Sequence, residues 1–285
     1  MNNYEKLEGM VAATFTPLDE NGDVNLSVID KYADWIASTP IKGVFVCGTT
    51  GEFSSLTIDE RKLILEKWLV SARKRFKVIA HVGSNCQRSA MELARHAAQV
   101  GADAIASIAP SFFKPGTVDE LVDFFAPICH SAAGLPFYYY NMPSITGVNL
   151  PVDKFLVEGK KKIPNLVGTK FTHNNLMEMG VCIELEQHRF EVLHGYDEIL
   201  ISGLAMGAVA GVGSTYNYIP NVYQAIFDSM KMNDLETARH NQIKSIRTVE
   251  VIIKYGGGVR GGKAIMKLIG IDCGCLLYTS DAADE

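Results

Sequence analysis

The fold is decided by one strand-then-helix stretch, in which GVFVC (43–47) passes through the turn GTTGE (48–52) into TIDERKLILEKWLVSARK (57–74). The first segment is a short apolar run, as expected of a strand that is covered on both faces. In the last segment, Thr57 and Glu60 match a capping box, which marks the start of a helix. The stretch therefore predicts one complete strand–turn–helix unit.

The same alternation recurs along most of the chain. Seven further apolar runs of strand length are each followed by a helical pattern, and they lie at 11–18, 78–84, 104–113, 136–143, 166–172, 191–198 and 208–217. Strands that alternate with helices imply a parallel sheet. Eight such units in 285 residues predict an α/β fold, a (β/α)8 TIM barrel. A doubly wound sheet is disfavoured, because no GxGxxG turn follows the first strand.

The domain organisation is predicted to be simple. Residues 1–274 are expected to form a single barrel domain, in which 232–270 add C-terminal helices that break at GGGVRGG (256–262). The final CLLYTSDAADE (275–285) matches the translation of a transposase sequencing adapter. We therefore expect a non-native tail there, with the natural chain cut near Gly274.

Composition and charge exclude several functional classes. The chain is 47% hydrophobic and 21% charged, which is typical of a globular protein with a sizeable core. Its net charge of -5 argues against a nucleic-acid partner. No apolar run of 18 residues predicts a membrane span, and the polar N-terminus does not resemble a signal peptide. A cytoplasmic location is expected.

The cysteines and histidines indicate neither a disulfide framework nor a metal site. The six cysteines have irregular spacing without a CxxC pair, so free thiols are expected. The histidines form no HExxH or HxH group, so no metal is expected. His81, His173 and His194 are interpreted as polar loop or core residues.

Lys170, in LVGTKFTHNN (166–175), is the candidate that is hardest to place. Side chains alternate along a strand, so Leu166, Gly168 and Lys170 are predicted to face into the barrel while Val167, Thr169 and Phe171 face outward. The alternative is a solvated lysine at a strand end. A buried lysine has a lowered pKa, and a neutral amine can form a Schiff base with a carbonyl compound.

Other polar groups gather at the predicted carboxyl ends of the strands, where barrel enzymes carry their chemistry. Thr49 and Thr50, with nearby backbone amides, could hold an anion near the start of a helix, or belong to a plain turn. In YYYN (138–141), at least one tyrosine hydroxyl is expected inside the barrel mouth. Asp197 and Glu198 could accept hydrogen bonds from a polyhydroxyl substrate, or cap a helix.

GGGVRGGKA (256–264) imitates a phosphate-binding loop, but the match is rejected. Such a loop needs Ser or Thr after its lysine and a strand before it. Here Ala264 follows Lys263, and no strand is predicted upstream.

Taken together, GTTGE, YYYNMP, GTKFT, GYDE and GSTYN resemble the dihydrodipicolinate synthase/N-acetylneuraminate lyase family over about residues 6 to 274. Within it, YNMPSITG, GTKFT and HGYDEI with GVGSTYN are similar to the lyase branch. The resemblance implies that Lys170 forms the Schiff base, with Tyr140 transferring protons. It also implies that Thr49 and Thr50 bind the carboxylate of the substrate. The residues implied to contact the sugar hydroxyls are Thr172, Gly195, Asp197, Glu198 and Ser214.

The resemblance also implies an activity. This is reversible class I aldol cleavage of N-acetylneuraminate to N-acetylmannosamine and pyruvate, without cofactor or metal, by a homotetramer. Another pyruvate-dependent aldolase or dehydratase, or a non-catalytic keto-acid binder, remains an alternative. One departure concerns Phe112 and Phe113, which stand where many relatives carry a tyrosine that relays protons.

Overall fold

Parallel strands form the centre of the molecule in the computed structural model, which describes residues 4–277. Within that range the eight strands are β1 (Gly9–Ala13), β2 (Gly43–Val46), β3 (Lys77–His81), β4 (Ala104–Ile108), β5 (Phe137–Asn141), β6 (Leu166–Phe171), β7 (Glu191–His194) and β8 (Ala210–Gly213). They pair in sequence order, and β8 pairs with β1 to close the barrel. The predicted TIM barrel is confirmed. Residues 278–285 of the predicted tail lie outside the described residues.

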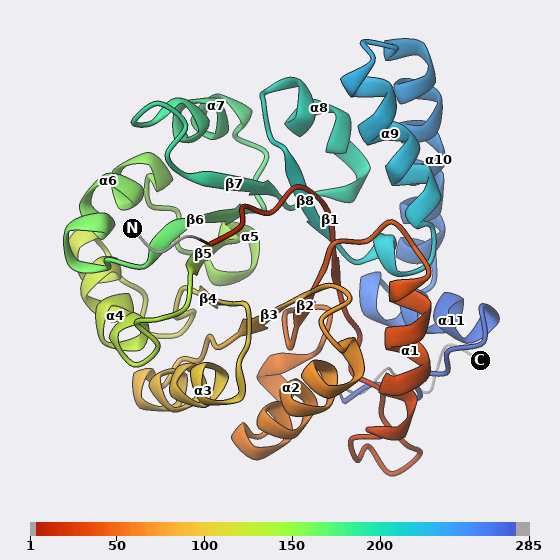
Figure 1. Cartoon of the computed structure of the whole chain (residues 1–285), viewed down its shortest axis with the longest axis horizontal. Helices are drawn as coiled ribbons and strands as arrows, with labels where there is room; N and C mark the ends of the chain where they lie inside the picture. Colours follow the sequence, from red (N-terminus) through yellow and green to blue (C-terminus); the bar gives the residue numbers. More distant parts are fainter. Residues whose placement is uncertain (1–3, 278–285) are drawn as a thin grey trace.

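Helices surround the strands (Figure 1). Those of the barrel are α1 (Ser27–Ala37), α2 (Ile58–Ala72), α3 (Gln87–Val100), α4 (Val118–His130), α5 (Pro143–Thr146), α6 (Val152–Lys162), α7 (Leu176–Glu184) and α8 (Leu200–Ala205). Short 3-10 turns are η1 (Phe53–Ser55), η2 (Asp197–Ile199) and η3 (Thr215–Asn217). No helix within residues 4–277 is long and apolar enough to cross a membrane.

The start of α2 follows the predicted capping box. Glu60 N donates to Thr57 Oγ1 at 3.2 Å, and Thr57 N donates to Glu60 Oε2 at 2.7 Å. Thr117 and Glu120 form a second capping box at the start of α4. These reciprocal bonds satisfy backbone amides that would otherwise lack partners, so the sequence fixes where each helix begins.

Apolar side chains form two layers, one inside the barrel and one between the strands and the helices. On β5, Tyr138 and Tyr140 belong to the inner layer and Tyr139 to the outer one, as alternation predicts. On β6 the prediction is wrong for two residues, because Leu166 packs in the outer layer and Val167 against the inner one. The cause is a shift of register between β5 and β6 beside Phe137, which interrupts simple alternation.

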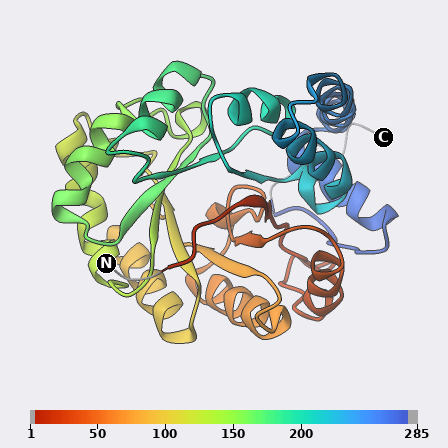
Figure 2. The same cartoon turned by 45° about the horizontal axis from the view of Figure 1, so that its top comes forward.

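The last third of the chain adds helices to one side of the barrel, next to α1 (Figures 1 and 2). They are α10 (Leu235–Lys254) and α11 (Gly258–Leu268), whereas α9 (Pro220–Lys231) beside them is the helix that follows β8 in the eighth unit of the barrel. The predicted break covers too many residues, because α11 already begins at Gly258. Gly262 lies inside α11, where a Cβ atom would lie 2.3 Å from the Phe15 ring. The glycine lets the helix pack closely and carries the neighbouring Lys263 into the interior.

Candidate active site

Lys170 lies near the carboxyl end of β6 and points into the barrel, with only 4% of its surface exposed. Its Nζ atom lies 4.0 Å from the centroid of the Tyr140 ring and 4.4 Å from that of Phe45. Within residues 4–277, no carboxylate forms an ion pair with this amine. Its immediate surroundings are therefore aromatic faces, which favour a cation without blocking the lone pair of a neutral amine.

The Tyr140 hydroxyl lies between the lysine strand and the GTTGE turn. Tyr140 and Lys170 are register partners on β5 and β6. The Tyr140 hydroxyl donates to Met142 Sδ at 3.0 Å, and it lies 3.3 Å from Thr49 Oγ1. An amine, a phenol and a threonine hydroxyl thus converge at the end of the barrel where catalysis occurs in this architecture.

The GTTGE turn follows β2 and leaves Thr49 and Thr50 half-buried. The backbones of Cys47 and Glu52 adopt left-handed φ angles of 53° and 57°, which cost energy for residues other than glycine. A buried ion pair of 2.7 Å between Glu52 Oε1 and Lys263 Nζ helps to hold this shape. The turn is tied to α11 as well as to its own strand.

The helix after the GTTGE turn begins where its capping box predicts, and not directly beside Thr49 and Thr50. The 3-10 turn η1 follows the motif, and α2 begins only at Ile58. The amide of Gly51 bonds inside the turn, donating to Gly48 O at 3.0 Å. The turn therefore offers an anion the threonine hydroxyls and the amides of Thr49 and Thr50, which donate to no described group, rather than the end of an α-helix.

The residues predicted to hold sugar hydroxyls come from the ends of β6, β7 and β8. A Cβ atom on Gly195 would lie 1.9 Å from Thr172 Oγ1, and one on Gly213 would lie 1.8 Å from Asp197 Oδ1. Thr172 Oγ1 is buried and has no hydrogen-bond partner among the described residues. The two glycines therefore leave room for polar atoms that are not yet satisfied.

Glu198 and Ser214 are half-buried beside this group, whereas Asp197 is buried. Burial raises the pKa of the Asp197 carboxyl to about 6, although hydrogen bonds from Thr215 oppose the shift. Thr215 donates to Asp197 Oδ2 from its amide at 2.9 Å and from its hydroxyl at 2.6 Å. No described residue donates to Asp197 Oδ1, which remains available as an acceptor.

His81 forms part of the site wall, which the sequence interpretation as a core residue did not anticipate. Its ring centroid lies 5.9 Å from that of Tyr140. Its Nδ1 lies 2.8 Å from Cys47 O, and its Nε2 accepts from Ile108 N at 3.3 Å. Burial holds the pKa of His81 well below its usual value. A neutral ring whose two nitrogens are both engaged supports the wall and does not transfer protons.

The loop after β4 supplies no phenol to the site. Phe112 and Phe113 are 76% and 86% exposed, and their rings stack edge to face at 4.9 Å. A phenylalanine ring has no proton to relay, so in this chain Tyr140 is the phenol nearest to Lys170 that the structure describes.

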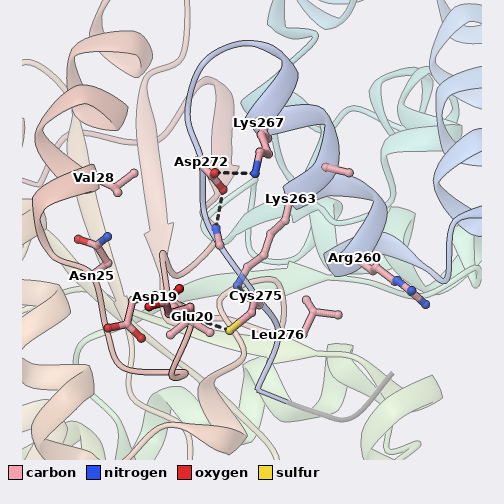
Figure 3. A pocket seen from close by; sticks show the side chains of 13 residues that line it. Asp19, Glu20, Asn25, Val28, Arg260, Lys263, Lys267, Asp272, Cys275 and Leu276 are labelled. Carbon is pink, nitrogen blue, oxygen red and sulfur yellow. Dashed lines mark hydrogen bonds and ion pairs between the residues drawn. The ribbon is translucent and has the colours of Figure 1, made fainter. Parts of the chain in front are cut away.

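The large pocket of Figure 3 lies elsewhere, between α11, the segment after β1 and residues 272–276. Its volume is about 960 Å³, and its wall contains none of the candidate site residues. Lys267 forms an ion pair of 2.9 Å with Asp272 there, and Lys263 donates to Cys275 O at 2.5 Å (Figure 3). Because Cys275 and Leu276 in its wall belong to the predicted non-native tail, we assign this pocket no binding role.

Comparisons with known proteins give a consistent pattern. The model of the dihydrodipicolinate synthetase family matches residues 6–278. The N-acetylneuraminate lyase of Mus musculus is 43% identical over 93% of this chain and 84% of its own length. The structure of Proteus mirabilis N-acetylneuraminate lyase has a TM-score of 0.94 at 36% identity and covers 98% of this chain and 95% of its own.

One solved relative bears on the lysine directly. It is described as a catalytic lysine mutant of Ruminococcus gnavus sialic acid aldolase. Its TM-score is 0.91 at 27% identity, with 97% of this chain and 90% of that chain covered.

Proposed function

Because the chain belongs to the dihydrodipicolinate synthetase family, we propose that it is a class I aldolase that reversibly cleaves N-acetylneuraminate to N-acetylmannosamine and pyruvate. The lyases of mouse and Proteus mirabilis support the substrate. The observation that carries the proposal is the position of Lys170 Nζ, buried in the barrel and 4.0 Å from the centroid of the Tyr140 ring.

Lys170 begins the reaction as the nucleophile. Its neutral amine attacks the keto carbon of the open-chain sugar acid, and loss of water with uptake of one proton from solvent leaves a protonated imine. The Thr49 hydroxyl lies 3.3 Å from the Tyr140 hydroxyl. Together with Thr50, it binds the carboxylate of the substrate next to the keto carbon. The site provides neutral donors for that carboxylate, and the imine nitrogen provides the positive charge.

Tyr140 serves the proton transfers. The C4 hydroxyl loses its proton to solvent by relay through the Tyr140 hydroxyl, the C3–C4 bond breaks, and the electron pair of that bond flows into the imine to give an enamine. N-acetylmannosamine leaves, and its aldehyde carbon is the atom that was C4 of the sugar acid. Protonation of C3 and hydrolysis of the imine then release pyruvate and restore the lysine. Tyr140 is suited to this role because its ring lies against Lys170 Nζ and its hydroxyl donates only to a weak acceptor, Met142 Sδ.

The other end of the substrate meets hydrogen-bonding groups. Asp197 Oδ1 and the carboxylate of Glu198 accept hydrogen bonds from sugar hydroxyls, while Thr172 and Ser214 offer hydroxyls of their own. Gly195 keeps space beside Thr172, where a Cβ atom would lie only 1.9 Å from its Oγ1. A site built to satisfy hydroxyls rejects substrates that lack them, because its own buried groups would stay unpaired.

Pyruvate release tests the proposal. Purified protein is given N-acetylneuraminate, and pyruvate is followed by coupling to lactate dehydrogenase and NADH. We expect turnover on N-acetylneuraminate and much slower turnover on a 2-keto-3-deoxy sugar acid without the N-acetylmannosamine portion. Turnover of the second compound alone would replace the proposed substrate while keeping the aldolase chemistry.

A homotetramer and a cytoplasmic location complete the proposal. The family resemblance supports the first, and the six cysteines, none of which forms a disulfide within the described residues, support the second. Light scattering on a size-exclusion column tests the assembly, since a monomeric mass would contradict it.

A further inference from the structure

A ring of hydrogen bonds lies behind the Asp197 carboxyl and returns to the same residue. The Thr215 hydroxyl donates to Asp197 Oδ2 at 2.6 Å and also contacts the Tyr223 hydroxyl. The Tyr223 hydroxyl lies 2.7 Å from Ser245 Oγ, and Ser245 Oγ donates to the backbone carbonyl of Asp197 at 3.1 Å. Four residues from η2, η3, α9 and α10 thus form a closed circuit.

The whole ring is withdrawn from water. Tyr223 and Ser245 have no exposed surface, Thr215 is 2% exposed and Asp197 is 6% exposed. Gln242 also holds the backbone of Asp197 in place. Its Nε2 donates to Asp197 O at 3.0 Å, and its Oε1 accepts from Ile201 N at 2.9 Å. Buried polar groups that lose a partner have no water to replace it.

The number of hydrogens limits the bonds of the ring when Asp197 is ionised, because three hydroxyls serve four contacts. A threonine hydroxyl has one hydrogen, and Thr215 gives it to the carboxylate. Ser245 gives its one hydrogen to the Asp197 backbone carbonyl, so the single hydrogen of the Tyr223 hydroxyl serves either Thr215 or Ser245, and not both. The hydroxyls of α9 and α10 therefore act on Asp197 through Thr215 on one side and through its backbone on the other.

We propose that Tyr223 and Ser245 are positioning residues that set the selectivity of this enzyme for a polyhydroxyl aldehyde by fixing where Asp197 Oδ1 points. The inference rests on the proposed function, because it concerns the half of the substrate that becomes the sugar. Within residues 4–277, neither side chain forms a hydrogen bond with Lys170, Tyr140 or Thr49. The ring consequently acts on the sugar half alone and leaves imine formation with pyruvate untouched.

Two variants cut the ring at different points. Ser245→Ala and Tyr223→Phe each remove a single oxygen, and Ser229→Ala and Tyr218→Phe are the matched controls. Ser229 is 3% exposed and lies on α9. The Tyr218 hydroxyl is buried without a hydrogen-bond partner among the described residues.

The assay is run in the synthetic direction with N-acetylmannosamine and pyruvate. Each ring variant is expected to raise the KM for N-acetylmannosamine about tenfold, as loss of a buried hydrogen bond predicts. The KM for pyruvate and the borohydride trapping of its imine stay at the wild-type level. In the background of Asp197→Ala, the effect of Ser245→Ala on the sugar KM disappears, because the side chain that Ser245 positions is no longer present.

The outcomes separate this inference from the function on which it rests. An active wild type whose ring variants match their controls overturns the inference alone. Equal rises in the KM for N-acetylmannosamine and in the KM for pyruvate also overturn it, since they indicate a general structural role. A wild type that traps pyruvate but neither cleaves nor makes N-acetylneuraminate overturns the proposed function, and the inference with it. Thermal unfolding checks that each variant is folded.

Discussion

Lys170 and Tyr140 are register partners on adjacent strands, and the lysine Nζ lies 4.0 Å from the centroid of the tyrosine ring. The pairing of β5 with β6 therefore sets the distance between the proposed nucleophile and the proposed proton carrier. Because strands are more rigid than loops, both groups are held before a substrate arrives, which lowers the entropic cost of reaching the reactive geometry.

Tyr140→Phe is expected to separate imine formation from turnover. Lys170 still forms the imine with pyruvate, whereas kcat for N-acetylneuraminate cleavage falls by about 10²- to 10⁴-fold, the usual loss when a general acid–base is removed. Steady-state kinetics measures the loss. Tyr139→Phe is the control, because Tyr139 lies on the same strand but in the outer apolar layer. Equal kcat values for the two variants would remove Tyr140 from the mechanism.

Asp197 predicts a specific dependence of stability on pH. Burial raises the pKa of its carboxyl from 3.8 to about 6, so the native state binds this proton more tightly than the unfolded state does. The stabilisation that this proton gives the native state is fully present below pH 3.8. It falls as the pH rises towards 6 and is then lost. A shift of this size corresponds to about 3 kcal/mol.

Asp197→Asn removes that titration. Urea unfolding of both proteins across the window should show the free energy of unfolding of the wild type falling relative to that of the variant as the pH rises. Taking the difference cancels groups that titrate equally in both proteins. Parallel curves would mean that the native pKa of Asp197 is not raised.

Lys263→Met tests the anchor of the GTTGE turn. Its ion pair with Glu52 leaves the two side chains 4% and 2% exposed, so the substitution strands a carboxylate in the interior. A loss of about 3–5 kcal/mol in the free energy of unfolding is expected. Lys267→Met is the control on the same helix, because its pair with Asp272 is 69% and 55% exposed and should contribute under about 1 kcal/mol.

The double variant Glu52→Leu/Lys263→Met then removes both charges. It should recover part of the lost stability, since no unpaired charge remains buried. If Lys263→Met and Lys267→Met cost the same, the buried pair does not anchor the turn.

Most of the barrel could be predicted from the sequence because its signals are local. The apolar run before GTTGE and the capping box of Thr57 and Glu60 lie within a few residues of one another, and similar signals mark the other units. The inward position of Lys170 also followed from alternation with its neighbours. These features need only the period of a strand and the chemistry of a helix start.

Features that depend on distant segments could not be predicted. Val167 turns inward because β5 and β6 shift register, which is a property of the pair and not of either strand. Ser245 and Asp197 are 48 positions apart, and nothing near either residue indicates that they bond. The same holds for Lys263, which sequence reasoning considered only as part of a phosphate loop.

The central claim is that Lys170 is the residue that forms the imine, and one measurement tests it most directly. The protein is incubated with pyruvate and borohydride, digested, and searched by mass spectrometry for the reduced adduct, with Lys170→Ala treated in parallel. The account predicts an adduct on the peptide that contains Lys170 and none in the variant. An adduct on another lysine, or none in the wild type, would contradict it.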